Sequence, residues 1–328
     1  MFRRLVITRL GTFVWSARSS RVPPRLSTFL SAVELKKFPT TQLSDRFALM
    51  LQSPPVVLTI AGFDPSSGAG ITADIKTIAA HGCYGVAAIT ALTVQSTAGV
   101  RHVTPVDPKF LSDILDELSS DIKISAVHVG MLGSGELAAV VADYLQRSQL
   151  PHMVLDPVLK STSGARLLDD AGIQVLTGRL LPIAEAVTPN ADEAAMLTGS
   201  RVEYVEDMRE AAKKLHEMGA KGVIVTGGHL DMTTDVLSLA NGEIQTFKSE
   251  RVNSACTHGT GCAFSTAIAC HLAQGRPLAE AVLLSKAYVS AAIANSYPIG
   301  KGFGPVNHMY RMKNHPGGFA KKLASGKD

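Results

Sequence analysis

The stretch VVLTIAGFDPSSGAGITADIKTIAAH, residues 56–81, contains a complete strand–turn–helix unit. Residues 56–61 are a continuous apolar run that predicts a strand, and residues 71–81 predict a helix. The glycine-rich segment between them is typical of a strand-to-helix turn. Because the strand lacks polar alternation, both of its faces are expected to be buried, as in a parallel sheet covered by helices. This stretch therefore indicates an α/β fold.

The same alternation continues along the chain. Further strands are predicted at residues 85–90, 126–130, 152–157, 184–189 and 221–228, and a hairpin is predicted to turn at Asn241-Gly242. Helices are predicted at residues 107–118, with Asp107 as the N-cap, and at 134–146, 191–197, 205–218, 261–272 and 278–295. Right-handed units of this kind form a three-layer α/β/α sandwich around a mostly parallel sheet. Ligands bind such sheets beyond the carboxyl ends of the strands, so we expect the polar chemistry of this chain there.

The bulk composition favours a globular protein and excludes several classes of partner. The 328 residues are 46% hydrophobic and 18% charged, and the formal net charge is only +4. Much of that excess lies at the two ends, so it does not argue for nucleic acid. No apolar run reaches the roughly 18 residues of a membrane-spanning helix, so no membrane partner is expected. The four cysteines, Cys83, Cys256, Cys262 and Cys270, lack zinc-site spacing, and a reducing compartment suits them.

Three segments differ in composition. Residues 1–50 carry arginines with no acidic residue before Glu34, which is typical of an organelle transit peptide or of an extension that does not fold. Residues 51–312 contain the predicted strands and helices and are expected to form one domain. Residues 313–328 are a polar tail that we expect to fray. The expected location is the cytoplasm, or an organelle if residues 1–50 are a transit peptide.

Two glycine- and acid-containing stretches are candidates for a binding site. AGFDPSSGAG, residues 61–70, matches neither standard phosphate-binding motif and alone indicates a structural turn; Asp74, one turn into the following helix, is either solvated or points back to the strand ends. TPNADEAAMLTG, residues 188–199, places Asn190 and Glu193 on one helix face. Glu193 is either an ordinary acid at a helix start or a group that holds the hydration shell of Mg²⁺ near phosphates.

The stretch ACTHGTGCAFSTAIAC, residues 255–270, places Gly259, Thr260 and Gly261 before a helix-like run. Free N–H groups at a helix start can bind a phosphoryl group. Cys262 would lie beside that group, where the helix start lowers the pKa of a thiol, so that it could act as a base. The alternative interpretation of Cys262 is a small, inert core residue.

Taken in order, AGFDPSSGAG, ADIKT, TALTVQST, GMLGS, DPV, TPNADEA, TGGH and THGTGCAFS resemble the hydroxymethylpyrimidine/phosphomethylpyrimidine kinases of thiamine biosynthesis, members of the ribokinase-like superfamily. The resemblance runs from about Val56 to Asn295, and the ordered set is specific although no single motif is. It implies a ribokinase-like kinase domain that uses ATP and Mg²⁺. The implied reaction is phosphorylation of 4-amino-5-hydroxymethyl-2-methylpyrimidine and then of its monophosphate. It also implies a homodimer.

The resemblance assigns roles to individual residues. On the substrate side, Gln95 would read the pyrimidine ring and its amino group, Asp74 would lie beside the substrate hydroxyl or amine, and Gly62 and Met131 would form pocket walls. Gly259 and Gly261 would form an anion hole, and Cys262 stands where relatives carry an aspartate base.

On the nucleotide side, the resemblance implies Asn190, Thr226, Gly228 and Lys160 as contacts and Glu193 and Asp156 as the acids that organise Mg²⁺. One departure is that Thr226 stands where the family commonly has a lysine before Gly-Gly-His; whether Lys160 compensates is open. Two other functions stay in play. One is a pyridoxine or pyridoxal kinase of the same superfamily, and the other is a non-catalytic pyrimidine sensor.

Overall fold

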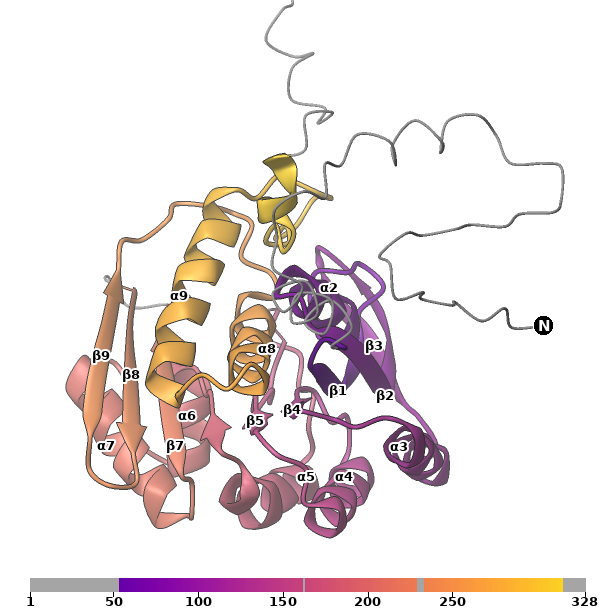
Figure 1. Cartoon of the computed structure of the whole chain (residues 1–328). Helices are drawn as coiled ribbons and strands as arrows, with labels where there is room; N and C mark the ends of the chain where they lie inside the picture. The colour runs from indigo at the N-terminus through magenta and orange to yellow at the C-terminus, as the bar shows by residue number, and fades with distance from the viewer. Residues whose placement is uncertain (1–52, 162, 229–232, 315–328) are drawn as a thin grey trace, which may run out of the picture. The chain divides into compact units, whose positions relative to one another are not determined.

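The computed structural model describes residues 53–161, 163–228 and 233–314 (Figure 1). The predicted N-terminal extension, nearly all of the predicted C-terminal tail and His229 of the Gly-Gly-His motif lie outside these residues. Within the described part, no helix is both long and apolar enough to cross a membrane.

The described strands form a single sheet with the order β3-β2-β1-β4-β5-β6-β7-β8-β9. The six strands from β2 to β7 in this order run parallel, whereas β3 and β8 run antiparallel to their neighbours. The strands are β1 (Val56–Phe63), β2 (Tyr84–Ser96), β3 (Gly99–Pro105), β4 (Ala126–Val129), β5 (Met153–Leu155), β6 (Ala186–Val187), β7 (Gly222–Gly227), β8 (Thr233–Leu239) and β9 (Ile244–Ser249). The predicted mostly parallel sheet is confirmed.

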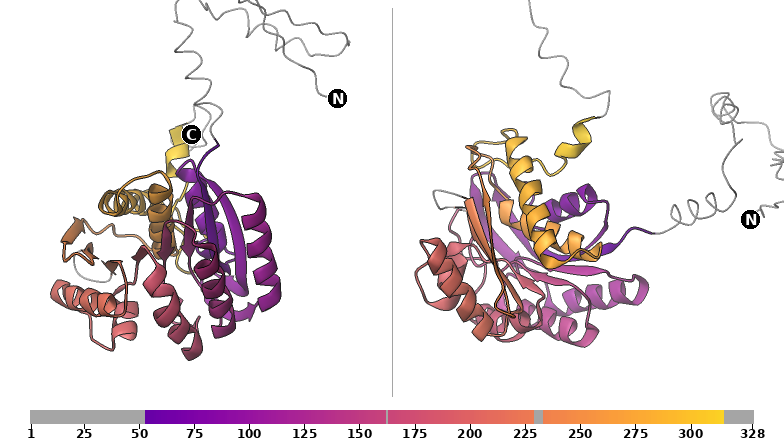
Figure 2. Two further views of the ribbon diagram at one scale, coloured as in Figure 1. Left: turned by 60° about the horizontal axis from the view of Figure 1, so that its bottom comes forward. Right: turned by 60° about the vertical axis from the view of Figure 1, so that its left-hand side comes forward.

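Helices cover both faces of this sheet, which gives the predicted three layers. One face packs against α3 (Pro108–Asp121), α4 (Gly135–Ser148), α5 (Asp170–Val175), α6 (Ala191–Thr198) and α7 (Val205–Glu217). The other packs against α2 (Gly70–Ala80), α8 (Thr260–Ala273) and α9 (Leu278–Ala294). In the right-hand view of Figure 2, α7 and α9 lie on opposite sides of the β8–β9 hairpin.

Strand β1 shows why the apolar runs are continuous. Leu58 and Ile60 enter the core beneath α3 and α4, while Val57 enters the core beneath α8 and α9, and all three are fully buried. A strand that lies between two helix layers needs apolar side chains on both faces. The helix starts also follow their sequence signals: Asp107 Oδ1 accepts a hydrogen bond from Phe110 N at 2.9 Å, as an N-cap should.

Strand β2 was predicted too short, and strand β3 and helix α5 were missed. Strand β2 continues to Ser96, beyond the predicted end at residue 90, and pairs with β3, which was not predicted. Beyond Thr90 the β2 side chains alternate, with Leu92 and Val94 more than half exposed and Thr93 and Gln95 lining a cavity, so no continuous apolar run marks this part. The short helix α5, capped by Asp169, was also missed because six residues are too few to establish a helical period.

Candidate active site

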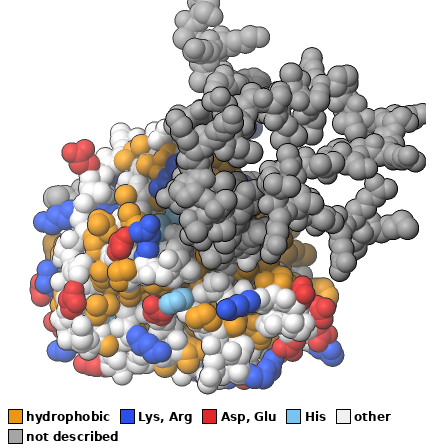
Figure 3. All heavy atoms as spheres, viewed as in Figure 1, with side chains coloured by type: hydrophobic (Ala, Val, Ile, Leu, Met, Phe, Trp, Pro, Cys, Tyr) orange, Lys and Arg blue, Asp and Glu red, His pale blue; other side chains and the backbone are white. Residues whose placement is uncertain are grey.

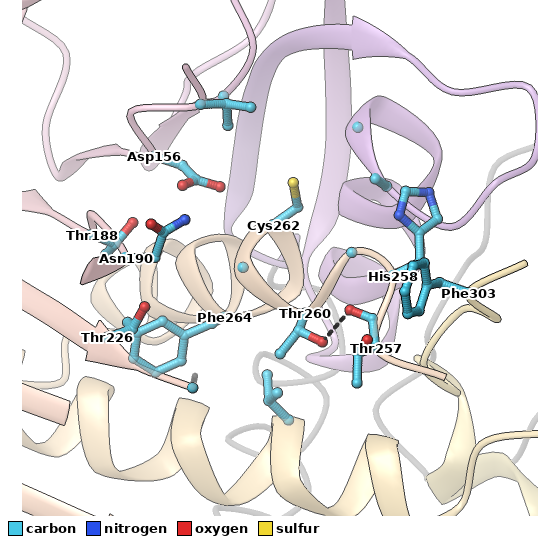
Figure 4. Close-up of a pocket in the computed structure, with 18 of the residues that line it drawn as sticks. Asp156, Thr188, Asn190, Thr226, Thr257, His258, Thr260, Cys262, Phe264 and Phe303 are labelled. Atoms are coloured by element: carbon cyan, nitrogen blue, oxygen red, sulfur yellow. Dashed lines mark hydrogen bonds between the residues drawn. The ribbon is translucent and has the colours of Figure 1, made fainter. Parts of the chain in front are cut away.

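A cavity of about 710 Å³ opens at the carboxyl ends of the parallel strands (Figure 4). It receives residues from the ends of β1, β2, β4, β5, β6 and β7 and from the start of α8. Every residue that the sequence nominated for the site lines it: Gly62, Asp74, Gln95, Met131, Asp156, Lys160, Asn190, Glu193, Thr226, Gly228, Gly259, Gly261 and Cys262. The strand order therefore brings together residues that are up to 200 positions apart (Gly62 and Cys262).

The floor of the cavity forms where two glycine-containing loops cross. Gly259 has φ of +78°, and a Cβ atom at this position would overlap the carbonyl oxygen of Gly68. Gly62 is also restricted, because a Cβ there would lie 2.8 Å from Met131 Sδ. Glycine at position 259 lets the AGFDPSSGAG turn and the THGTGC loop pack backbone against backbone, and glycine at position 62 makes room for the Met131 side chain. The turn is therefore a structural partner of the THGTGC loop, which explains why it matches neither standard phosphate motif.

The first turn of α8 faces this cavity. Gly259 is its N-cap and supplies no capping side chain, and a Cβ on Gly261 would meet no atom within 4 Å. The Thr260 hydroxyl instead turns back to the Thr257 carbonyl oxygen at 2.6 Å (Figure 4). N–H groups at the start of a 14-residue helix that lack a capping side chain are suited to bind an anion.

Cys262 lies in this first turn, with its sulfur on the other side of the helix from the Thr260 hydroxyl (Figure 4). The predicted lowering of its pKa is wrong for the protein without ligands. Burial and the carboxylates of Asp156, Asp74 and Glu193 raise the pKa of this thiol well above its usual range, and the hydrogen bond from Gly70 N–H does not offset them. Cys262 is therefore a neutral thiol in this state, because nearby negative charge outweighs the helix start.

Asp156 and Glu193 are two buried acids at the ends of β5 and β6. Burial raises the pKa of Asp156 to about 6, although His128 and hydrogen bonds from Ser265 and Cys262 act in the opposite direction. Burial and the neighbouring Asp156 raise the pKa of Glu193 to about 8. The charged form of each acid is therefore disfavoured, because too little positive charge lies nearby to stabilise it.

The Asn190–Glu193 pair has the geometry of a capping box. Asn190 Oδ1 accepts from Glu193 N at 2.9 Å, and Glu193 Oε2 accepts from Asn190 N at 3.0 Å. The interpretation of Glu193 as an ordinary helix-start acid is therefore correct as far as it goes. The same carboxylate still lines the cavity, so its capping role does not remove it from the site.

Asp74 forms part of the cavity lining and is fully buried. Thr59 Oγ1 and Thr266 Oγ1 donate to its two oxygens at 2.7 and 2.9 Å, and His128 Nδ1 is 3.4 Å away. Burial opposes the charged form of His128, but the Asp74 carboxylate raises its pKa overall. These contacts tie β1, β4 and α8 together at the site, a role that the sequence did not indicate.

Asn190 adjoins these acids through its bonds to Glu193, and two other nucleotide-side candidates are Lys160 and Thr226. Lys160 is exposed on a turn closed by the hydrogen bond from Ser161 N to Ala165 O at 2.8 Å, and it has no ion-pair partner among residues 53–161, 163–228 and 233–314. Thr226 N donates to Pro189 O at 2.9 Å, which joins the ends of β6 and β7. Lys286 of α9 also lines the cavity, but Asp235 accepts from its ammonium at 2.7 Å in a nearly buried pair.

Sequence reasoning missed several lining residues. His258 stands inside the THGTGC motif, so its position could have been noticed. Phe303, Val289 and Ile293 come from the C-terminal part of the chain, and nothing in their local sequence marks them as lining a site. On the face drawn in Figure 3, acidic and basic side chains of the described residues are interspersed, so that face offers no single-sign surface.

Comparison with known proteins gives a consistent family. Residues 64–307 match the family model described as phosphomethylpyrimidine kinase. The chain is 42% identical over 257 residues to a hydroxymethylpyrimidine/phosphomethylpyrimidine kinase from Haemophilus influenzae, covering 77% of this chain and 96% of that protein. It is 46% identical over 254 residues to the thiamine biosynthesis bifunctional protein ThiED of Geobacter sulfurreducens, covering 77% of this chain but only 52% of that longer protein.

The fold also resembles a solved structure with a different substrate in its name. The Bacillus subtilis pyridoxal kinase in complex with ADP superposes with a TM-score of 0.73 and 34% identity, covering 80% of this chain and all of that one. Since the family model spans most of the described domain and the Haemophilus relative matches nearly end to end, the chain belongs to the phosphomethylpyrimidine kinase family.

Proposed function

We propose that this chain transfers the γ-phosphoryl group of ATP to the hydroxymethyl oxygen of 4-amino-5-hydroxymethyl-2-methylpyrimidine, and then a second phosphoryl group to the monophosphate. In the first step the hydroxyl oxygen bonds to the γ-phosphorus, the bond to the β-phosphate oxygen breaks to release ADP, and the hydroxyl proton leaves. The observation that carries this proposal is the shared cavity in which the helix-start N–H groups of α8 and the Gln95 amide both lie. One cavity can then hold both reactants.

We assign the acceptor side to Gln95 and the transfer itself to the first turn of α8. An amide both donates and accepts, which suits the edge of an aminopyrimidine. Gly261 leaves open space, and the backbone N–H groups of this turn face the phosphoryl oxygens, whose negative charge the helix start stabilises. Cys262 is the proposed acceptor of the hydroxyl proton. Met131 and Gly62 form the adjoining wall, and Asp74 also lines the cavity.

Asp156 and Glu193 fit a Mg²⁺ ion. No cluster of three or more His, Cys, Asp or Glu side chains that could enclose a metal occurs among the described residues. Mg²⁺ does not need one, since it keeps waters and takes phosphate oxygens beside one or two carboxylates. Two buried acids with raised pKa values are groups that a cation would stabilise in the ionised form. When bound, the ion supplies charge neutralisation for the transferring phosphoryl group.

The nucleotide would lie on the β5–β7 side of the cavity, near Asn190, Thr226, Gly228 and Lys160. Thr226 offers a hydroxyl and no charge, so the Lys160 ammonium, which pairs with no acid among the described residues, is the proposed neutralising cation for the ATP phosphates. These assignments rest on their shared position on one cavity wall.

A kinase assay with two acceptors tests the proposal. The pyridoxal kinase likeness makes pyridoxal the specific rival, because it too carries a hydroxymethyl group on an aza-aromatic ring. We expect ADP release to depend on the aminopyrimidine, with a lower kcat/KM for pyridoxal. Faster turnover of pyridoxal would favour the rival. Absence of turnover with either acceptor at saturation would instead favour a sensor that binds without catalysis.

Two further assignments are proposed for the whole chain. The side chains of Leu92 and Val94 on β2 are 51% and 55% exposed, on the strand face opposite Gln95, and would be covered in a homodimer. The expected location is the cytoplasm, or an organelle if residues 1–50 act as a transit peptide.

A further inference from the structure

Three side chains from distant parts of the chain form a connected series at one wall of the cavity. His258 Nε2 lies 2.9 Å from Asp64 Oδ2 and 3.3 Å from Gln95 Nε2, and Gln95 Oε1 lies 3.2 Å from Thr93 Oγ1. The side chains of His258 and Asp64 are only 12% and 4% exposed. The series therefore reaches from a buried carboxylate to the amide that faces the cavity.

Asp64 can only accept hydrogen bonds in this series. It receives Ser66 N at 2.8 Å, the Ser66 hydroxyl at 2.7 Å and Ala69 N at 2.9 Å. Burial alone would raise its pKa, but the hydrogen bonds from His258, Ser66 and Ala69 outweigh burial and lower it. An ionised Asp64 requires a proton on His258 Nε2, which fixes the direction of that hydrogen bond.

The imidazole also has little room to turn. A Cβ atom on Gly68 would overlap His258 Cδ2, so the ring packs directly on the backbone of the Asp64 turn. The backbone of His258 is also held, because His258 N donates to Gly304 O at 3.1 Å. The hydrogen on Nε2 is taken by Asp64, so Nε2 presents no lone pair to the Gln95 amide 3.3 Å away and cannot accept a hydrogen bond from it.

His258 and Thr93 together determine which way the Gln95 amide faces. The single Thr93 hydroxyl hydrogen is used by the Phe63 carbonyl oxygen at 3.0 Å, so Thr93 Oγ1 can only accept from Gln95. Amide oxygen and nitrogen are nearly equivalent in shape, and hydrogen bonding assigns them. The amide nitrogen therefore faces Thr93 Oγ1, which can accept from it, and Oε1 faces the protonated Nε2, which shares its hydrogen mainly with Asp64 and could not accept from an amide N–H. The second lone pair of Oε1 and the second N–H of the Gln95 amide are then free for a ligand, and the positions of acceptor and donor are fixed.

We propose that His258, held by Asp64, is a positioning residue that locks the Gln95 amide and thereby sets the preference for a ring with an amino group beside the hydroxymethyl arm. The locked Oε1 accepts from the ring amino group while the amide N–H donates to the adjacent ring nitrogen. The inference rests on the proposed role of Gln95. It adds a specificity-determining pair, His258 and Asp64, that need not touch the substrate.

The test compares 4-amino-5-hydroxymethyl-2-methylpyrimidine with the same compound lacking the amino group. The preference is the ratio of the two kcat/KM values. Met and Gln side chains have nearly the same shape, but only Gln donates a hydrogen bond. We expect His258→Met to reduce the preference at least about fivefold, mainly by raising KM for the amino substrate, because a lost hydrogen bond changes affinity on this scale. His258→Gln should keep the preference within about twofold, since its amide N–H replaces the imidazole donor.

Lys76→Met is the matched control, because Lys76 Nζ donates to Ser67 O at 2.8 Å and holds the same turn without reaching Gln95. We expect both kcat/KM values to fall together in this variant, with an unchanged preference. If the His258 variants do not fold, Thr93→Val removes the acceptor at the other end of the series. It should likewise lower the preference.

Gln95→Ala distinguishes the role of Gln95 in reading the amino group from the role of His258 in positioning Gln95. If the preference disappears in Gln95→Ala and survives in His258→Met, or in Thr93→Val where the His258 variants do not fold, Gln95 reads the amino group without positioning by His258, and our inference is overturned. If the preference survives even in Gln95→Ala, the role of Gln95 and our inference fail together, while kinase activity itself stands. An equal fall of preference in Lys76→Met would show a general effect of the turn and would also overturn it.

Discussion

Replacing Cys262 with alanine distinguishes a catalytic base from a packing residue. If the thiol accepts the hydroxyl proton, its removal should lower kcat by about 10²–10⁴-fold, the contribution of a positioned base. That range corresponds to about 3–5 kcal/mol in the activation free energy. If the side chain only fills space, the removal of one half-buried sulfur should change stability by about 1 kcal/mol and the rate very little.

The structure also sets the form of the wild-type pH dependence. Because burial and nearby carboxylates hold the pKa of Cys262 well above its usual range, the free enzyme has almost no thiolate at neutral pH. The Cys262 thiol is hydrogen-bonded to Asp156, so charge neutralisation at Asp156 removes the largest electrostatic opposition to the thiolate. We therefore expect kcat of the wild type to rise with pH above neutrality and that slope to vanish in Cys262→Ala.

The assay is single-turnover phosphorylation under saturating ATP and pyrimidine, with calorimetric titration as the control for binding. Cys262→Asp should recover part of the rate, but only part, since it adds a carboxylate beside Asp156. Because alkylation requires the thiolate, iodoacetamide should inactivate the enzyme slowly at neutral pH and faster as the pH rises, and bound pyrimidine should slow that loss. The buried Cys83 and Cys270 should react little. A single-turnover rate for Cys262→Ala within about threefold of the wild type refutes the base, because it falls far short of the range for a lost base.

Four further outcomes are expected. Gln95→Ala should weaken pyrimidine binding by roughly 1–3 kcal/mol with ATP affinity unchanged, and equal calorimetric affinities would refute its assignment. Thr226→Lys should lower the apparent KM for ATP and Lys160→Ala should raise it; if neither moves it, both residues lie away from the nucleotide. Chelation of divalent cations should abolish turnover and weaken ATP binding, and unchanged titrations with EDTA would contradict the two-carboxylate site. Burial lowers the pKa of His271 to about 4, so this ring stays neutral in the folded state and gains a proton in the unfolded chain below about pH 6.5. His271 should therefore contribute a loss of about 1.4 kcal/mol in the free energy of unfolding per pH unit between about pH 6.5 and 4, and thermal melts should show a shallower loss of stability in His271→Gln than in the wild type over that range.

The layered fold was predictable because a strand that is buried on both faces is a continuous apolar run in the sequence. Leu58, Ile60 and Val57 form one apolar run because two helix layers cover β1. Strand β3 shows no such run, since four of its seven residues are exposed and its partner β2 alternates between apolar and polar residues where the two pair. Edge strands are specified by pairing more than by composition, and pairing cannot be read from a single sequence.

The grouping of the site residues was also predictable, but the contacts that these residues make were not. Residues that follow parallel strands must meet at one edge, so the sequence alone suffices to group Asp156, Asn190 and Thr226. It does not reveal the partners of such residues. His258 meets Asp64 across 194 positions because two loops cross at Gly68 and Gly259, a contact that neither local sequence specifies. The pKa of Cys262 was mispredicted for the same reason, since it depends on three acids from other elements.

The charges around the cavity explain why a threonine at position 226 is compatible with a kinase. Six acids line the cavity (Asp64, Asp74, Asp156, Glu193, Asp235 and Glu250), against the lysines and arginine Lys160, Lys286 and Arg251. Lys286 is already paired with Asp235, and hydrogen bonds stabilise the ionised Asp64, which leaves Asp156 and Glu193 as the buried acids whose charged forms are disfavoured. A nucleotide polyanion placed beside them is repelled unless a cation arrives with it. A permanent lysine at position 226 would offset part of that repulsion. In the proposed arrangement threonine leaves the neutralisation to a bound cation and to Lys160, and we therefore expect ATP binding in this chain to depend more strongly on both.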